Sequence, residues 1–406
     1  MRQRMQLSDM ERGMLEGERG DAVRTAMEIL VALGEIFDAD RLLPVRSVQI
    51  AGVSYHNLGD AGLEFVEQMA TDGRAVVPTS LNPAGMDPDR YREMGIDAEF
   101  AARQMRIVEA FRRMGVNTTL TCTPYHVGLV PARDDTLAWS ESSAVTYANS
   151  VLGARSNREG GPSALAAALC GRTPRYGLHL DETRRPTLRV IAAGSLRCPA
   201  DWGLLGAAIG QQRPGALPLI ETAERPDQVS LKSLAAALPT FGGQPMFHVA
   251  GVTPEAARHA LPADSLCVDA ALLRATRERL EIGAEDRVDL VTVGCPHASL
   301  DELEQLARLL ADRRVVAPLW ISTAPAICQQ AAKRGLSQTI ELSGARIWSG
   351  TCFAVAPLKG RFTQVVTNSA KGCYYGAGHN LFRMRLASLE RCVQTALAGR
   401  WSEVDR

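Results

Sequence analysis

Three of the nine cysteines occupy positions from which a thiolate could bind a metal. Cys295 follows a predicted strand at residues 288–293 and precedes a helix-capping pattern. It should therefore lie near the positive end of a helix, where the pKa of a thiol falls. Cys122 ends a predicted strand at 118–122, and Cys352 lies in a glycine-containing turn. If they converge, these sulfurs could hold an iron–sulfur cluster with one iron open to a ligand; buried, unreactive thiols are the alternative.

The other six cysteines show no comparable pattern. The scattered positions, the odd total and the absence of a CxxC motif argue against a secreted disulfide framework. The three in apolar helical stretches, which we expect to be core residues, are Cys170, Cys328 and Cys392. Cys198 and Cys267 belong to no cluster of functional residues, and Cys373 is left unassigned.

The densest polar stretch, residues 139–162, combines short polar side chains with two arginines. This composition suits recognition of a carboxylate or a phosphate, whereas the alternative is a solvated loop with ordinary helix caps. Lys371 follows a predicted strand at 365–366 and is a second candidate anion contact. Three histidines near these loops are not assigned as metal ligands: His56, His126 and His297. The polar residues of the stretch are Glu141, Ser142, Ser143, Asn149, Arg155, Asn157, Arg158 and Glu159.

The elements that carry these loops alternate between strands and helices, which predicts an α/β fold with mainly parallel sheets. In such sheets ligands bind at the carboxyl ends of the strands, where the candidate residues fall. A charged, proline-containing stretch at 181–186 is the predicted boundary between two lobes, 1–185 and 186–406. Helices are predicted at 22–37, 62–70 and 101–114, and strands at 45–53, 75–78, 188–193, 245–250, 288–293 and 315–321.

Length and charge narrow the class of protein further. The chain has 406 residues, which is too long for one ordinary core. Lys plus Arg and Asp plus Glu both number 45, so nothing favours a nucleic-acid partner. The N-terminal sequence has no apolar signal segment, and no stretch has the length needed to span a membrane. We therefore expect a cytoplasmic protein.

Several segments together resemble one family, aconitase X. They are SVQIAGVSYHNLGDAGLEF, VPTSLNPAGMD, TLTCTPY, WSESSAVTYANSVLGARSNREGGPSALAAAL, GCPHASLDEL and TNSAKG. The likeness runs through nearly the whole chain, and SNREGGPSALAAAL is its most specific part. It implies three packed α/β units of the aconitase type, with the small swivelling domain absent from this chain. It therefore also implies a separate small subunit as partner.

The resemblance also implies a cofactor and an activity. The family's cluster ligands match Cys122, Cys295 and Cys352, and the cluster would contain fewer irons than that of ordinary aconitase, with 2Fe–2S favoured and 3Fe–4S as the other form. Members of the family are lyases that dehydrate small hydroxy acids. The expected substrate contacts are Asn82, Ser142, Ser143, Arg155, Asn157, Arg158, Glu159 and Lys371. Ser143 and Lys371 are also candidate catalytic residues, although the general base could belong to the partner subunit.

The family has two known activities, so the resemblance alone does not decide the substrate. The composition, rich in Ala and Arg, favours cis-3-hydroxy-L-proline, which would be dehydrated to a pyrroline-2-carboxylate. Mevalonate 5-phosphate is the alternative, because Arg155 and Arg158 could bind either anion. A cluster-bearing regulatory or RNA-binding protein is a hypothesis from another class, and the neutral net charge argues against it. A metal-free scaffold subunit is a further alternative.

Overall fold

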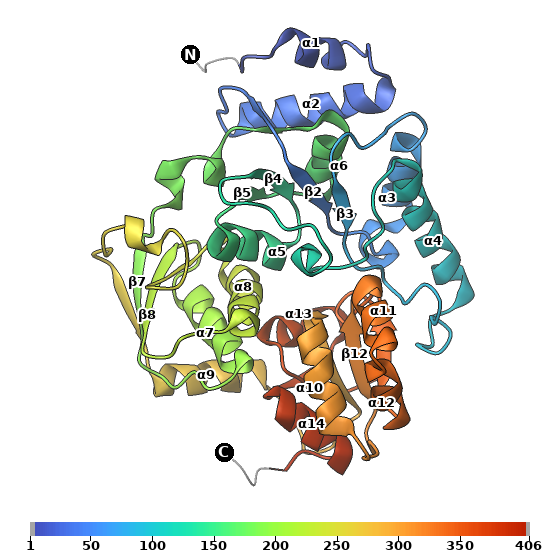
Figure 1. Cartoon of the computed structure of the whole chain (residues 1–406), viewed down its shortest axis with the longest axis vertical. Coiled ribbons are helices and arrows are strands. Elements are labelled where there is room, and N and C mark those ends of the chain that lie inside the picture. Colours follow the sequence, from blue (N-terminus) through green and yellow to red (C-terminus); the bar gives the residue numbers. More distant parts are fainter. Residues whose placement is uncertain (1–4, 403–406) are drawn as a thin grey trace.

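The computed structural model of the chain describes residues 5–402. Its strands form three parallel sheets that follow one another along the chain, with four, four and five strands. Helices cover the sheets, so the architecture is α/β, as the sequence predicted (Figure 1). In Figure 1 the blue-to-green first unit lies at the top, the yellow-green second unit at lower left and the orange-to-red third unit at lower right.

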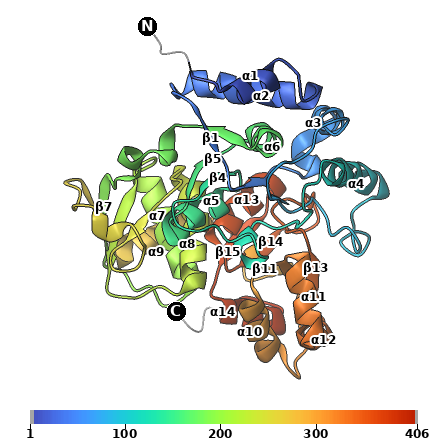
Figure 2. The same ribbon diagram turned by 45° about the horizontal axis from the view of Figure 1, so that its top comes forward.

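The first unit contains most of the polar loops. Its helices are α1 (Asp9–Leu15), α2 (Asp21–Ile36), α3 (Tyr55–Met69), α4 (Ala98–Arg113), α5 (Ser142–Tyr147) and α6 (Gly161–Cys170). Its strands are β1 (Leu42–Pro44), β2 (Ser47–Ile50), β3 (Thr79–Leu81), β4 (Thr136–Trp139), β5 (Arg155–Arg158) and β6 (Arg172–Pro174). The sheet order is β3-β2-β4-β5, and β1 pairs with β6 in a separate antiparallel ribbon. Helix α2 packs on α6 and α3 on α4, and both views show α1 beside α2 at the outer edge (Figures 1 and 2).

Several predicted boundaries in the first unit are wrong. Residues 118–122, predicted as a strand, form an irregular loop in which Leu120 has a positive φ of 44°. This loop is held by single hydrogen bonds to the neighbouring strand, such as Thr121 N–H to the carbonyl of Leu81 at 2.9 Å. The strand predicted at 75–78 begins at Thr79, and the helix predicted at 62–70 begins earlier, at Tyr55 of α3.

The second unit has the sheet order β10-β7-β8-β9, with α7, α8 and α9 as its helices. The strands are β7 (Leu188–Ala192), β8 (Pro218–Thr222), β9 (His248–Val249) and β10 (Ser265–Val268). The helices are α7 (Pro199–Gln212), α8 (Gln228–Gly242) and α9 (Ala270–Leu280). Helix α8 packs on α7 and also contacts α5 of the first unit and α13 (Ala370–Asn380) of the third. The three units therefore share one interior around α8.

The third unit has the sheet order β13-β12-β11-β14-β15. The strands are β11 (Leu290–Ala298), β12 (Leu319–Thr323), β13 (Arg346–Ser349), β14 (Gln364–Thr367) and β15 (Arg383–Leu386). Besides α13, its helices are α10 (Leu300–Leu310), α11 (Pro325–Lys333), α12 (Leu336–Leu342) and α14 (Leu389–Ala398). The register of β11 against β12 shifts between Val293 and Ala298, so the strand bulges there. Bulges of this kind re-aim side chains next to functional sites.

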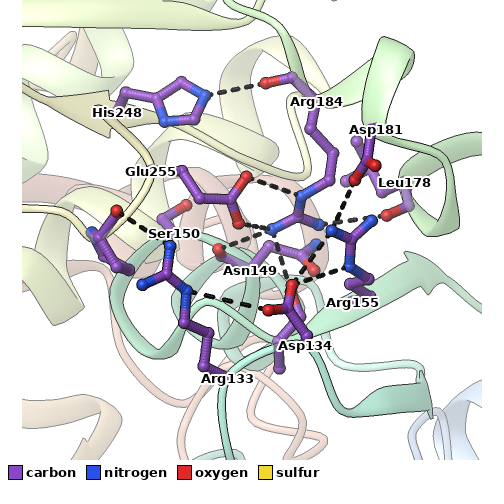
Figure 3. A network of polar contacts seen from close by, with 12 residues as sticks. Arg133, Asp134, Asn149, Ser150, Arg155, Leu178, Asp181, Arg184, His248 and Glu255 are labelled. Atoms are coloured by element: carbon purple, nitrogen blue, oxygen red, sulfur yellow. Dashed lines mark hydrogen bonds and ion pairs between the residues drawn. The ribbon is translucent and has the colours of Figure 1, made fainter. Parts of the chain in front are cut away.

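The predicted boundary at 181–186 is a fixed junction between the first two units. Two short 3₁₀ turns, Gly177–His179 and Asp181–Arg184, occupy this segment. The guanidinium of Arg184 is buried and pairs with Glu255 of the second unit, while it also donates to the carbonyls of Asn149 and Ala154 in the first (Figure 3). The buried ion pair and the two carbonyls together satisfy this charge and hold the two units against each other.

Within residues 5–402, none of the helices combines the length and the apolar character that a membrane-spanning segment requires.

Candidate active site

The carboxyl ends of the strands of the first unit face the third unit across a cavity of about 300 Å³. The loop after β2 contributes residues 51–54, and the loops after β3 and β4 contribute Asn82 and residues 140–142. The third unit contributes the bulge of β11, the loop after β13 and one face of α13. A parallel bridge between Ala84 and Thr351, with a 2.9 Å hydrogen bond from Ala84 N–H to the carbonyl of Gly350, joins the two sides. This position at the strand ends is where parallel sheets bind ligands.

The structure brings Cys122, Cys295 and Cys352 together in this cavity, although they are far apart along the chain. All three side chains are buried. Cys295 projects from the bulge of β11, Cys352 follows β13, and Cys122 ends the irregular loop of the first unit. The backbone N–H of His297 donates to the sulfur of Cys122 at 3.2 Å. The convergence that the sequence analysis required is therefore present in the structure.

The sequence predicted that a nearby helix end lowers the pKa of Cys295, and this prediction is wrong. Cys295 lies inside β11 rather than at the start of a helix, because α10 begins only at Leu300. Burial raises the pKa of Cys295 instead of lowering it, and it raises the pKa of Cys122 to about 12. The pKa of Cys352 also lies well above its usual value because of burial. The three groups are therefore thiols at neutral pH, and metal binding there must displace their protons.

The donor set fits an iron–sulfur cluster better than a single ion. Among the described residues, no three His, Cys, Asp or Glu side chains are arranged to hold one metal ion. A cluster distributes its cysteine ligands over more than one iron, and its sulfides fill the space between them. Three sulfurs that face one cavity, without a fourth cysteine in its lining, also leave part of such a cluster open to a substrate.

A buried ion pair lies beside the cysteines. Lys371 Nζ, on the first turn of α13, pairs with a carboxylate oxygen of Glu141, and the two side chains are only 10% and 12% exposed. The other carboxylate oxygen of Glu141 accepts from Asn82 Nδ2 at 2.8 Å. Ser143 donates to Glu141 from both its hydroxyl, at 3.0 Å, and its backbone N–H, at 3.3 Å. Lys371 Nζ also lies 3.4 Å from Ser142 Oγ.

These contacts fix the charges of the pair. Burial disfavours the ionised carboxylate, but the charge and hydrogen bonds of Lys371 outweigh it and lower the pKa of Glu141 to about 2. Burial likewise disfavours the ammonium, while the charge of Glu141 raises the pKa of Lys371 above its usual value. Both groups are therefore ionised at neutral pH, and neither can act as a general base without losing its partner.

Arg158 is the second basic residue that lines the cavity. It lies at the end of β5, is exposed, and has no carboxylate within ion-pair distance in residues 5–402. Because Glu141 and Lys371 neutralise each other, Arg158 leaves the cavity with a net positive charge. An anionic ligand therefore matches the cavity electrostatically.

Three of the predicted substrate contacts do not line the cavity. Arg155 pairs with Asp134 at 3.0 Å and Asp181 at 2.6 Å, which saturates its guanidinium (Figure 3). Asn157 donates to the carbonyl of Tyr176 and accepts from the N–H of Leu178. These two side chains hold the junction between the first two units in place.

Glu159 is the third predicted substrate contact that lies outside the cavity. It accepts from the hydroxyls of Ser163 and Thr173, and burial raises its pKa. Side chains on neighbouring positions of a strand point to opposite faces, so one strand end cannot direct all of the predicted residues into one cavity. Of the substrate contacts predicted from sequence, Asn82, Ser142, Arg158 and Lys371 line the cavity, and Ser143 lies behind it against Glu141.

Some cavity residues were missed by the sequence analysis. Tyr375 and His379 line the cavity from the same face of α13 as Lys371, at helical spacings of four and eight residues. That spacing is a signal the sequence contains. Asn57, in the first turn of α3, also lines the cavity, although it lies before the helix predicted at 62–70.

Comparison with known proteins agrees with this geometry. Family models for the first, second and third domains of aconitase X match residues 4–182, 186–285 and 288–398. The chain belongs to the aconitase X family. A crystal structure of Thermococcus kodakaraensis aconitase X in its holo-form is 40% identical, with a TM-score of 0.91 over 97% of this chain and 100% of that one. The predicted family and fold are therefore confirmed.

The curated relatives are dehydratases of two kinds. The phosphomevalonate dehydratase large subunit of Methanothermobacter thermautotrophicus is 47% identical over 92% of this chain and 94% of its own length. That of Methanosarcina mazei is 41% identical over 98% of both chains. Cis-3-hydroxy-L-proline dehydratase of Pseudomonas aeruginosa is 36% identical over 97% of this chain and 70% of its own length.

These names confirm that this aconitase X protein is a hydro-lyase. They favour the alternative substrate over the first choice, because the phosphomevalonate relatives are the more similar ones. The prediction of hydroxyproline was based on the overall amino-acid composition, which reflects the genome more than the residues of the active site.

Proposed function

We propose that this chain is the large subunit of an iron–sulfur dehydratase that acts on mevalonate 5-phosphate. The observation that carries the proposal is the convergence of Cys122, Cys295 and Cys352 in one cavity whose remaining net charge is positive. The identity to phosphomevalonate dehydratase large subunits supports the choice of substrate. The words "large subunit" in those names support a small-subunit partner for this chain as well.

The reaction is loss of water from a 3-hydroxy acid. A proton leaves the carbon next to the carboxylate, the bond between C3 and the hydroxyl oxygen breaks, and a C2–C3 double bond forms. When it is bound, the cluster supplies a Lewis-acidic iron that makes the hydroxyl a better leaving group. We propose a 2Fe–2S cluster on the three cysteines.

Lys371 and Ser142 would bind the substrate carboxylate and the charge that develops on it. The Lys371 ammonium is held in position by Glu141, so it need not reorganise during the reaction. Arg158, which has no carboxylate partner among the described residues, would bind the phosphate at the exposed side of the cavity.

The general base is proposed to come from the partner subunit. Lys371 is held as a cation, and the hydroxyl of Ser143 donates to Glu141. Glu141, whose pKa is about 2, is too weak a base at neutral pH. None of these three groups, Lys371, Ser143 and Glu141, is therefore a suitable proton acceptor.

The test is to purify the chain with its small subunit under anaerobic conditions and to offer mevalonate 5-phosphate and cis-3-hydroxy-L-proline separately. The proposal expects turnover of the phosphorylated acid alone. Arg158→Gln should raise KM for it about tenfold or more, because a charge-assisted hydrogen bond is worth about 1.5–3 kcal/mol. Arg155→Gln, in which a saturated arginine is changed, should leave KM unchanged. Turnover of hydroxyproline alone would overturn the choice of substrate.

A further inference from the structure

The buried side chain of His297 bridges the segments that carry the three cavity cysteines. It lies in the bulge of β11 and is fully buried. Its Nδ1 is 3.1 Å from the hydroxyl of Thr121, and its Nε2 is 3.0 Å from the carbonyl oxygen of Thr351. Thr121 precedes Cys122, Thr351 precedes Cys352, and His297 itself lies two residues after Cys295.

These contacts define the hydrogen-bonding roles of the imidazole. A carbonyl oxygen can only accept, so Nε2 of His297 must carry a hydrogen and donate it to Thr351. Nδ1 can then accept from the hydroxyl of Thr121, which also accepts from the backbone N–H of Thr123 at 3.2 Å. One neutral imidazole therefore links a loop of the first unit to a loop of the third.

The backbone of His297 is held equally firmly. Its N–H donates to the sulfur of Cys122, and its carbonyl accepts from Lys232 Nζ at 3.1 Å. Lys232 lies on α8 of the second unit and pairs with Glu302 on α10, and both side chains are buried. All four polar groups of His297 are thus engaged, and through them it contacts residues from each of the three units.

We propose that His297 is a positioning residue for the iron–sulfur centre. Its imidazole holds the three cysteine segments at their mutual spacing before the cluster assembles, and its N–H stabilises the Cys122 thiolate afterwards. Hydrogen bonds around metal ligands commonly change metal affinity 10- to 100-fold, and donors to the sulfurs tune a cluster. This role goes beyond ligation, and it rests on the proposed cluster.

Cluster retention tests the proposal directly. Wild type, His297→Ala and His297→Gln are reconstituted anaerobically with iron and sulfide, and the rate of iron loss to a chelator is measured. His297→Ala should lose iron about tenfold faster or more. Glutamine, whose amide can still donate to Thr351, should recover part of the difference. His248→Ala is the control, because His248 is equally buried and its Nε2 lies 2.9 Å from the carbonyl of Arg184, outside the lining of the cavity that contains Cys122, Cys295 and Cys352.

A milder pair of variants covers the case in which His297→Ala does not fold. Thr121→Val removes the hydroxyl that faces Nδ1 of His297. Thr292→Val removes a buried hydroxyl that has no hydrogen-bond partner among the described residues. The first should accelerate iron loss and the second should not.

Alkylation of the cluster-free chain gives a readout that needs no iron. In His297→Ala, Cys122, Cys295 and Cys352 should react with iodoacetamide faster than in wild type, while the reactivity of the buried core Cys170 stays unchanged. Equal alkylation and equal iron loss in wild type and His297→Ala would overturn the positioning role alone. A wild-type chain that takes up no iron would overturn the proposed cluster, and the positioning role with it.

Discussion

Replacing Lys371 by methionine should destabilise the chain strongly, because it leaves the carboxylate of Glu141 buried without its cation. The two side chains are 10% and 12% exposed, so water cannot replace the lost partner. Asn82 and Ser143 still donate to Glu141, but neither carries a charge. Methionine keeps most of the volume of the lysine side chain, so the change is mainly electrostatic.

The magnitude follows from the pKa of Glu141. Its value of about 2, against an ordinary 4.5, corresponds to about 3 kcal/mol of preference for the ionised form in the folded chain. This stabilisation is fully present above the unfolded pKa and is lost as the pH falls from about 4.5 to 2. Breaking one side of a buried ion pair costs about 3–5 kcal/mol, so Lys371→Met should cost about 3 kcal/mol at pH 7.

Urea unfolding of the cluster-free chain at pH 7 measures the change in the free energy of unfolding. Wild type, Lys371→Met, Glu141→Gln and the double variant form a double-mutant cycle. The double variant should be more stable than Lys371→Met alone, because it no longer buries an unpaired charge. The exposed pair Arg103 and Glu99, replaced in the same way, should show a much smaller coupling, because solvent screens exposed charges. Additive effects at Glu141 and Lys371, or a cost below about 1 kcal/mol for Lys371→Met, would refute the reasoning.

Two further predictions concern other buried positions. Gly294→Ala should be far more destabilising in urea unfolding than Gly128→Ala. Both glycines have a φ near 95°. A Cβ at Gly294 would lie 2.2 Å from the carbonyl oxygen of Ser322, whereas a Cβ at Gly128 would meet nothing within 4 Å. Equal losses would show that the bulge tolerates a side chain. Burial lowers the pKa of His179 to about 4, so the unfolded chain binds more protons between about pH 6.5 and 4, and stability should fall as the pH drops through that window. His179→Leu should therefore reduce the loss of unfolding free energy between pH 7.5 and pH 5 by about 2 kcal/mol, and an unchanged loss would contradict this.

The general architecture could be predicted because it depends on local patterns. Apolar runs followed by polar loops predicted β2, β7, β11 and β12 close to their observed positions. A serine followed three residues later by a glutamate, as at Ser8 and Glu11, predicts the capping box that is observed at the start of α1. The α/β class and the position of the site at strand ends follow from these elements.

The orientation of side chains could not be predicted in the same way. Arg155 and Arg158 lie three residues apart on β5, yet the first is saturated by two aspartates and the second lines the cavity. The partners of Arg155 come from a preceding loop and a following 3₁₀ turn, so only the tertiary structure shows which arginine is available. The pKa of Cys295 was mispredicted for a similar reason: the residue lies inside β11, away from the start of α10, and burial raises its pKa.

The most direct test of the central claim is anaerobic iron and sulfide analysis, with absorption spectra, of the wild type and of single cysteine variants. Wild type should contain equal amounts of iron and acid-labile sulfide, and Cys122→Ala, Cys295→Ala and Cys352→Ala should each lose the cluster absorbance while the chain stays folded. Cys170→Ala, in the core of the first unit, should keep both the cluster and the activity. Wild-type iron content in any of the three variants would contradict the proposed ligands, and a colourless, iron-free wild type would contradict the cluster itself.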